Sequence, residues 1–331
     1  MKEKVIQFVS STSHLATGSY RIWVNDLNSY FNKVSIPSFI SSDYNQESDI
    51  VICGKSDWQI AVKIKILFPE KKVGVINLSA DKRDLPIDFV IVGSLEEADS
   101  LSCYKNVFLF PLIEDMYQSP QDYKAHAPVE RLRIGFHGHY PHLNKFYPHL
   151  GPALEELEKK HKLDFELYII TSNTNPAWHI GKPNIKNIKI KRWDFDTIKQ
   201  DLLSCDVGVV PNITNLTLEE LKLKNSTDLG LYNTDYVLRM KNKSNAGRCF
   251  VFHQLGVPVV ADFTPSNFHI LGDPDNGYVA FNKETWVKAL LELSNHKKRQ
   301  DIANSAKKEF DRLYNPYDWA KKLYNNIGDI K

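Results

Sequence analysis

Short apolar runs that alternate with helix-like stretches are the feature that most limits the fold of this 331-residue chain. Continuous runs of β-branched and aromatic residues are typical of strands in a parallel sheet that is covered on both faces. Stretches with an apolar residue at every third or fourth position separate them and are typical of crossover helices. In the first third of the chain the predicted strands are residues 5–9, 49–53, 73–78, 89–92 and 107–110, and the predicted helices are residues 21–31 and 58–67.

A polar connector, IEDMYQSPQDYKAHAP, interrupts this alternation before a second series begins. The second series has predicted strands at 132–137, 165–171, 185–190, 206–211 and 258–262, and predicted helices at 151–161, 195–204, 248–255 and from 286 onward.

Two such series joined by a connector predict an α/β fold made of two Rossmann-like, doubly wound parallel-sheet domains with a cleft between them. We place the N-terminal domain at residues 1–127 and the C-terminal domain at residues 128–315. A terminal helix at about residues 316–331 is expected to pack back on the N-terminal domain.

Composition and charge narrow the class of protein. Hydrophobic residues make up 42% and charged residues 25% of the chain, as in an ordinary globular protein. A net charge of only +2 argues against nucleic acid as a partner. The four cysteines form no C-x-x-C pair, which predicts free thiols in a reducing compartment. No apolar stretch near the N-terminus has the length of a signal peptide or membrane span, so we expect a cytoplasmic protein, with peripheral association at the inner face of a membrane left open.

Two segments resemble a known family. Residues 243–262, KSNAGRCFVFHQLGVPVVAD, are similar to the helix, Gly-x-Pro turn and strand in the donor domain of retaining GT-B glycosyltransferases of the family 4-like group. Residues 203–212, LSCDVGVVPN, resemble the element that precedes this helix in those enzymes. The similarity covers roughly residue 132 to the C-terminus. It implies that the C-terminal domain binds a nucleotide-sugar donor and that the sugar passes to a glycan or lipid-linked acceptor, in the synthesis of cell-surface polysaccharide.

A polar loop before the predicted helix at 248–255 is the candidate phosphate site. Backbone N–H groups and the positive end of the helix dipole attract phosphate to a helix start. Glycine permits close approach, while lysine and arginine neutralise diphosphate charge. We predict that the donor phosphates contact Lys243, Ser244, Asn245, Gly247 and Arg248; the alternative is an ordinary capped helix with solvated basic residues.

The chain also departs from the family pattern. The family's pair of glutamates around this helix is absent, because the second position is Val251 and the first falls in the Lys-Ser-Asn loop. The family's Gly-Arg … Lys loop is replaced by Gly138-His139 … Lys145. Sugar and ribose must therefore be held differently, and a CMP-linked acidic sugar such as Kdo is an alternative donor.

A histidine-rich turn, HGHYPH at residues 137–142, follows a predicted strand at the sheet edge where ligands bind. A histidine there can donate to a phosphate or sugar hydroxyl, or act as a general base. We predict His137 as a catalytic residue and Gly138 and His139 as donor-binding residues, against the alternative of packed or solvated rings. No acidic or cysteine ligand lies nearby, and the D-x-D at 194–196 is placed to cap a helix, so neither a metal nor another cofactor is expected.

Sugar transfer also needs a group near the anomeric carbon and a base for the acceptor. Asp235, with Asp228 as second candidate, is predicted to stabilise or attack the anomeric carbon; the alternative is a solvated loop acid or a helix cap. His14, in the loop after the first strand, is predicted to take the acceptor proton.

Two other functions remain compatible with the sequence: a GT-B-fold sugar-nucleotide epimerase and a non-catalytic nucleotide-sugar-binding protein. Release of free nucleotide in the presence of an acceptor distinguishes a transferase from both.

Overall fold

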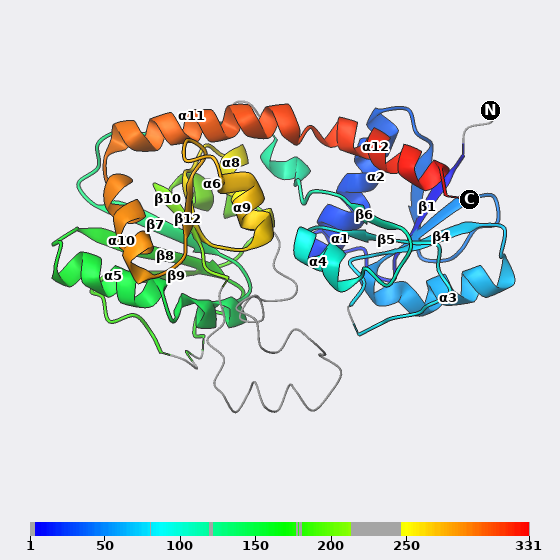
Figure 1. Ribbon diagram of the computed structural model, residues 1–331, viewed down its shortest axis with the longest axis horizontal. Coiled ribbons are helices and arrows are strands. Elements are labelled where there is room, and N and C mark those ends of the chain that lie inside the picture. Colours follow the sequence, from blue (N-terminus) through cyan, green and yellow to red (C-terminus); the bar gives the residue numbers. More distant parts are fainter. Residues whose placement is uncertain are drawn as a thin grey trace. The chain divides into compact units, whose positions relative to one another are not determined.

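The computed structural model describes residues 4–79, 81–118, 122–176, 178, 181–212 and 246–330. The chain divides into two compact units (Figure 1). Unit 1 comprises Met1–Gln118 and Asp311–Lys331, and unit 2 comprises Ser119–Phe310. The structural boundary thus follows residue 118, and the connector residues 119–127 belong to unit 2, whereas the sequence-based boundary follows residue 127.

Unit 1 contains a parallel sheet whose strand order, in the described residues, is β2-β1-β3-β4-β5-β6. The direction of winding reverses at β1, which pairs with both β2 and β3. The strands β1, β3 and β5 are buried along their whole length, as expected for a sheet covered on both faces. The bounds are β1 Ile6–Val9, β2 Ser38–Ser41, β3 Ile50–Cys53, β4 Lys72–Ile76, β5 Phe89–Val92 and β6 Val107–Leu109.

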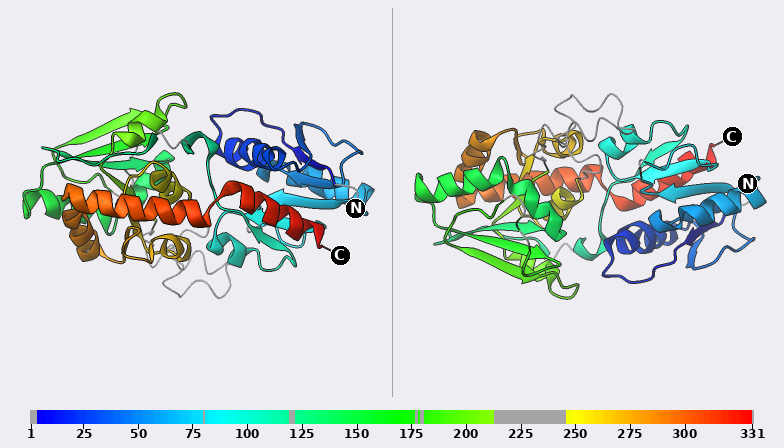
Figure 2. Two further views of the ribbon diagram at one scale, coloured as in Figure 1. Left: turned by 90° about the horizontal axis from the view of Figure 1, so that it is seen from above. Right: turned by 90° about the horizontal axis from the view of Figure 1, so that it is seen from below.

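The last helix of the chain, α12 (Pro316–Gly328), belongs to unit 1. It lies beside α2 (Leu27–Lys33) (Figure 2). The rings of Tyr30 and Tyr317 meet edge to face with their centres 5.9 Å apart. Lys72 Nζ donates to the carbonyl oxygen of Ile327 at 3.1 Å. The other described helices of unit 1 are α1 Gly18–Tyr20, the π-helix η1 Arg21–Asp26, η2 Lys55–Asp57, α3 Trp58–Leu67, α4 Leu95–Ser100 and η3 Asp115–Tyr117.

Unit 2 has its own parallel sheet, with the order β12-β11-β10-β7-β8-β9 in the described residues. Numbered along unit 2 from β7, this is the order 3-2-1-4-5-6 of the Rossmann fold read from β9, with the change of direction between β7 and β10. The predicted class of two Rossmann-like, doubly wound domains is confirmed. The bounds are β7 Leu132–His137, β8 Phe165–Thr171, β9 Ile188–Arg192, β10 Val207–Val210, β11 Val259–Asp262 and β12 Tyr278–Ala280.

Helices cover the unit 2 sheet and complete its core. One face packs on α5 and α10 through a cluster that includes Phe136, Leu154 and Trp286. None of the described helices of either unit combines the length and apolarity needed to cross a membrane. The bounds are η5 Tyr140–Phe146, α5 Leu150–Lys159, α6 Ile198–Leu203, α8 Gly247–Gln254, α9 Pro265–Leu271, α10 Lys283–Glu292 and α11 His296–Leu313.

Short elements account for the differences from the sequence-based assignment. The strand β2 reads SFIS and is only partly buried, so it lacks the continuous apolar run of an interior strand. The strand β12 has three residues. Neither was predicted, nor were α4 and α9. The strand expected at 185–190 is observed at Ile188–Arg192, because Ile185 lies in the approach to the strand.

Candidate functional site

The carboxyl ends of β7 and β10 meet at the point where the unit 2 sheet reverses its winding. The two strands pair directly, with Ile134 opposite Val207. In open α/β sheets, ligands bind outside the carboxyl ends of the strands at such a point. The turn that begins at His137 and the pair Pro211–Asn212 therefore flank the expected ligand position.

Arg248, in the first turn of α8, joins these two strand ends. Its Nη2 donates to Asn212 Oδ1 at 2.8 Å and to the carbonyl oxygen of Pro211 at 3.3 Å. The guanidinium carbon lies 5.4 Å from the centre of the Phe136 ring. A Cβ built on Gly138 would lie 3.8 Å from Arg248 Cδ. The guanidinium is thus held over the switch point by groups from both strands.

The charge of Arg248 is not neutralised by an ion pair with any described residue. Burial lowers the pKa of its guanidinium to about 10, against the opposing effect of the nearby Asp262 carboxylate, so the group stays cationic at neutral pH. Its Nη1 is buried and has no hydrogen-bond partner in the described part of the chain. A half-buried charge without a counter-ion and a buried donor without an acceptor are both unfavourable, and an anion placed at Nη1 would relieve both.

Asp262, the last residue of β11, orients the groups that hold Arg248. It is 1% exposed, and its two carboxylate oxygens accept from Asn212 N at 2.7 Å and Trp286 Nε1 at 2.9 Å. Sequence reasoning missed Asp262. The available signal was an acid that ends an otherwise apolar strand, VVAD, at the sheet edge where ligands bind.

The histidine turn divides into three environments. His137 is buried and packs edge to face on Phe252 of α8, with ring centres 5.1 Å apart. Gly138 has φ +151°, a conformation that residues with a side chain rarely adopt, and it lies against Arg248. His139 is exposed and lies beside Tyr140. The structure therefore brings Gly138 next to the cation.

The predicted phosphate loop is described only in part. Gly247 and Arg248 are the first two residues of α8, at the same sheet edge as Asn212. Val251, at the position of the missing glutamate, is 1% exposed and packs in the interior. The remaining predicted residues of this region, Lys243, Ser244, Asn245, Asp228 and Asp235, lie outside the described residues.

His14 lies in unit 1, on the exposed loop after β1. Its Nδ1 accepts a hydrogen bond from Ala16 N at 3.1 Å, so in the neutral ring Nε2 carries the proton. This tautomer can donate from Nε2; accepting a proton there requires the other tautomer and the loss of the Ala16 bond. Arg21 supports the loop by donating to the carbonyl oxygen of Leu15 at 2.8 Å, and it forms a buried ion pair with Glu114 at 2.7 Å.

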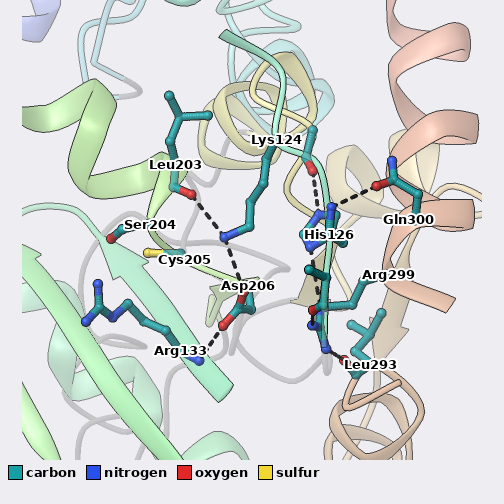
Figure 3. Close-up of polar contacts among 12 residues, drawn as sticks. Lys124, His126, Arg133, Leu203, Ser204, Cys205, Asp206, Leu293, Arg299 and Gln300 are labelled. Carbon is teal, nitrogen blue, oxygen red and sulfur yellow. Dashed lines mark hydrogen bonds and ion pairs between the residues drawn. The ribbon is translucent and has the colours of Figure 1, made fainter. Parts of the chain in front are cut away.

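The far end of α8 is anchored by the connector (Figure 3). His126 Nε2 donates to the carbonyl oxygen of Gly256 at 2.9 Å, just beyond the end of the helix. Arg299, fully buried, donates to His126 Nδ1 at 3.4 Å and to the carbonyl oxygens of Ala127 and Leu293 at 2.9 Å each. Burial, with the positive charges of Lys124 and Arg299, lowers the pKa of His126 to about 4, so the ring is neutral.

A second set of bonds ties the connector to the amino ends of the strands. Lys124 Nζ forms an ion pair with Asp206 at 3.2 Å and donates to the carbonyl oxygen of Leu203 at 3.0 Å (Figure 3). The other oxygen of Asp206 accepts from Arg133 N at 2.8 Å. The amino edge of the sheet and the end of α8 thus form one framework, which positions the start of α8 at the opposite edge.

Comparison with known proteins supports the architecture. No protein-family model and no curated protein sequence matches the chain. Among solved structures, a glycosyltransferase from Rickettsia africae superposes with a TM-score of 0.60 at 11% identity over 99% of both chains. Anabaena HepE in complex with UDP and glucose gives 0.59 at 10% identity over 99% of this chain and 100% of HepE. TarM gives 0.53 at 15% identity over 85% of this chain, which spans 55% of the length of TarM.

At identities this low the likeness concerns the fold. All three solved structures match across both units or most of them. The chain therefore has the GT-B fold, in which two Rossmann-like units each carry their own parallel sheet.

Proposed function

We propose that this chain is a glycosyltransferase that moves a sugar from a nucleotide-sugar donor, bound by unit 2, to a glycan or lipid-linked acceptor. Cell-surface polysaccharide or glycolipid synthesis is the process in which we place it. The observation that carries the proposal is Arg248: a cation at the switch point of the unit 2 sheet that forms no ion pair with a described residue. The GT-B fold, shared with a glycosyltransferase and with a protein that binds UDP and glucose, supports it.

Arg248 suits the leaving group of glycosyl transfer. Breaking the bond between sugar and nucleotide leaves negative charge on the diphosphate, and positive character develops on the anomeric carbon. A preoriented guanidinium stabilises that charge more strongly as it grows, which lowers the barrier. Arg248 lies in the first turn of α8, where the helix dipole also favours negative charge. Since this positive charge comes from the protein, the proposal requires no metal ion, and we expect turnover to survive EDTA.

The remaining catalytic roles are part of the same proposal. Asp235, with Asp228 as second candidate, is proposed to stabilise or attack the anomeric carbon in a retaining reaction. Asp235→Asn should then reduce turnover by orders of magnitude with little change in nucleotide affinity, because the interaction is made only in the transition state. His14 takes the acceptor proton, and His137 or His139 contacts the donor.

Nucleotide binding is the first test. A panel of UDP, GDP and CMP should contain one nucleotide that raises the melting temperature by mass action. Replacing Arg248 by Ala should weaken binding of that nucleotide by about 1.5–3 kcal/mol, the value of a buried charge-assisted hydrogen bond. Arg131→Ala is the matched control, because Arg131 is a half-exposed arginine of unit 2 at the opposite edge, paired with Asp164. Equal affinities of the folded Arg248→Ala protein and the wild type would refute the phosphate role.

Turnover is the second test. With a nucleotide sugar and a glycan or lipid-linked acceptor, a transferase releases free nucleotide only when the acceptor is present. Conversion of the sugar without nucleotide release would indicate an epimerase. Binding without either reaction would indicate a binding protein.

A further inference from the structure

Buried polar atoms without a partner extend beyond Arg248 along the same sheet edge. Thr171 Oγ1, at the end of β8, and Asn144 Oδ1, in η5, are buried and have no hydrogen-bond partner among the residues that the structure describes. Thr171 is 0% exposed. Leaving such groups unpaired is costly, so native proteins nearly always satisfy them with protein, water or ligand.

The strand order places Thr171 and the turn beside Arg248 at one edge of the sheet, and Asn144 follows that turn. β8 lies next to β7 on the side away from β10, and Gly138 N donates to the carbonyl oxygen of Ile170 at 3.1 Å. Thr171 is the residue after Ile170, so it ends β8 beside the turn that holds Arg248. Asn144 lies in η5, which follows this turn directly. Adjacent strands are about 4.8 Å apart, so one ligand of nucleotide size reaches across β10, β7 and β8.

The hydrogen-bonding character of the unpaired atoms changes from the β10 side to the β8 side of this edge. At the β10 side the unpaired atom belongs to a cation that can only donate. At the β8 side the unpaired atoms are a hydroxyl, which donates and accepts, and an amide oxygen, which accepts. The complementary ligand is anionic at one end and carries neutral hydroxyl groups at the other.

We propose that Thr171 and Asn144 bind hydroxyl groups of the donor while Arg248 binds its phosphate. The inference rests on the proposed function and deepens it. Carboxylates commonly hold ribose hydroxyls in Rossmann-like domains. The helix α8 contains no Asp or Glu, and Val251 in its middle is buried in the core. Recognition of the donor hydroxyls therefore moves from α8 to neutral groups beside β7 and β8.

Thr171→Val is the decisive variant, because it removes the hydroxyl and keeps the shape. If the Thr171 hydroxyl has no partner within the protein, the ligand-free Thr171→Val variant should have the melting temperature of the wild type or a slightly higher one. UDP or UDP-glucose affinity, measured by calorimetry, should fall about 5- to 15-fold, the loss of one or two neutral hydrogen bonds. Thr171→Ser, which retains the hydroxyl, should bind like the wild type. Asn144→Leu should reproduce the loss independently.

Comparing UDP with UDP-glucose shows whether Thr171 binds a hydroxyl of the ribose or of the transferred sugar. Equal losses for UDP and UDP-glucose assign Thr171 to the ribose, and a loss for UDP-glucose alone assigns it to the sugar; the same panel with GDP or CMP donors applies if UDP does not bind. A lower melting temperature of Thr171→Val with unchanged affinity would show that the hydroxyl is bonded within the protein and would overturn the inference.

The Arg248→Ala variant measured in parallel keeps the two proposals distinct. If the wild type binds no nucleotide, or if Arg248→Ala binds as tightly as the wild type, the proposed function fails. If Arg248→Ala loses affinity while Thr171→Val and Asn144→Leu do not, only the present inference fails.

Discussion

The two sheets end in chemically different edges although both are doubly wound and parallel. At the switch point of unit 2, Arg248 is a half-buried cation with no ion pair in the described residues. At the switch point of unit 1, between β1 and β3, the polar groups are a hydroxyl and a carboxylate: Ser10 Oγ donates to the carbonyl oxygen of Thr12 at 2.8 Å, and Asp57 accepts from Ser11 N at 3.3 Å. The buried arginine of unit 1, Arg21, is paired with Glu114.

The difference concerns the charge that each unit presents at its switch point. Parallel winding provides a place for a ligand in each unit, and side-chain charge decides what that place accepts. Unit 1 neutralises its buried arginine through Glu114, whereas Arg248 of unit 2 forms no ion pair with a described residue. In the function we propose, the charge of Arg248 binds the donor phosphate and unit 1 binds an uncharged acceptor hydroxyl near His14.

The largest expected effect breaks this contrast directly. Arg21→Met should destabilise the protein by about 3–5 kcal/mol, because Glu114 is left buried without its cation. Arg248→Met should leave the free energy of unfolding unchanged or raise it, while nucleotide affinity falls. Urea unfolding of both variants checks the prediction. Replacing both partners, as Arg21→Met with Glu114→Leu, should restore much of the loss; equal destabilisation by Arg21→Met and Arg248→Met would remove the contrast.

The next prediction concerns the pH dependence of the stability of unit 1, which Asp26 controls. Burial, with the negative charges of Glu114 and Asp115, raises the pKa of Asp26 to about 6. The folded state therefore binds this proton more tightly than the unfolded state, whose pKa is about 3.8. The protonated carboxyl of Asp26 therefore stabilises the folded state below pH 3.8, and this contribution is lost as the pH rises through 6.

Asp26→Asn should therefore stabilise the protein by up to about 3 kcal/mol at pH 8 and hardly at all at pH 4. The amide oxygen can still accept the bond from Asp115 N, which Asp26 receives at 3.1 Å. Urea titrations at the two pH values measure the difference. A gain that is the same at both would show that ionisation of Asp26 is not the cause.

Unit 2 should show the opposite pH dependence. The pKa of His126 is lowered to about 4, so the folded state binds this proton more weakly than the unfolded state, with its value near 6.5. The stability contributed by the neutral His126 ring is present above pH 6.5 and is lost as the pH falls through 4, by about 3 kcal/mol. His253, buried in α8 with a pKa of about 4, adds an effect of the same sign.

His126→Gln should reduce this acid sensitivity, because the glutamine amide can donate to the carbonyl oxygen of Gly256 without a titrating ring. The exposed His139→Gln is the control and should leave the pH profile unchanged. Unfolding at pH 4.5 and pH 7.5 gives the comparison. If the stability of His126→Gln depends on pH as strongly as that of the wild type, His253 rather than His126 causes the acid sensitivity.

The smallest expected effect is the change in stability and in nucleotide affinity when either of two turn glycines, Gly138 and Gly54, is replaced by alanine. Gly138→Ala places a side chain at φ +151° and next to His142, so it should cost about 1–2 kcal/mol and also weaken nucleotide binding through Arg248. Gly54, in unit 1, has an ordinary φ of −61°, but an added Cβ would lie 2.8 Å from Asp57 Oδ2. Gly54→Ala should lower stability without changing nucleotide affinity. Loss of affinity in Gly54→Ala would contradict the division of roles between the units.

Regular elements with a strong pattern were predictable. The helix at Trp58–Leu67 and the strands at Phe89–Val92, Leu132–His137 and Phe165–Thr171 occur within the predicted bounds, because apolar runs and helical spacing are local properties. Elements of three or four partly buried residues, such as β2 and β12, carry too little pattern to be found.

The candidate site was accessible only in part. Gly138 and Arg248 stood out because a glycine after a strand and an arginine at a helix start have recognisable uses. Asp262 and Thr171 did not, since each acquires its role from contacts far along the chain, as when Asp262 accepts from Asn212 fifty residues away.

The amino-acid sequence alone was sufficient to establish two α/β series and the residue types near their strand ends. Hydrophobic periodicity specifies local elements and the faces they bury. It does not specify strand order, and only the order β10-β7-β8 brings Arg248, Gly138 and Thr171 to one edge. Nor does it distinguish Arg21 from Arg248. The energy of a charge depends on burial and on partners that distant segments supply. The tertiary structure alone therefore decided that Arg21 has an ion pair and that Arg248 has none with a described residue.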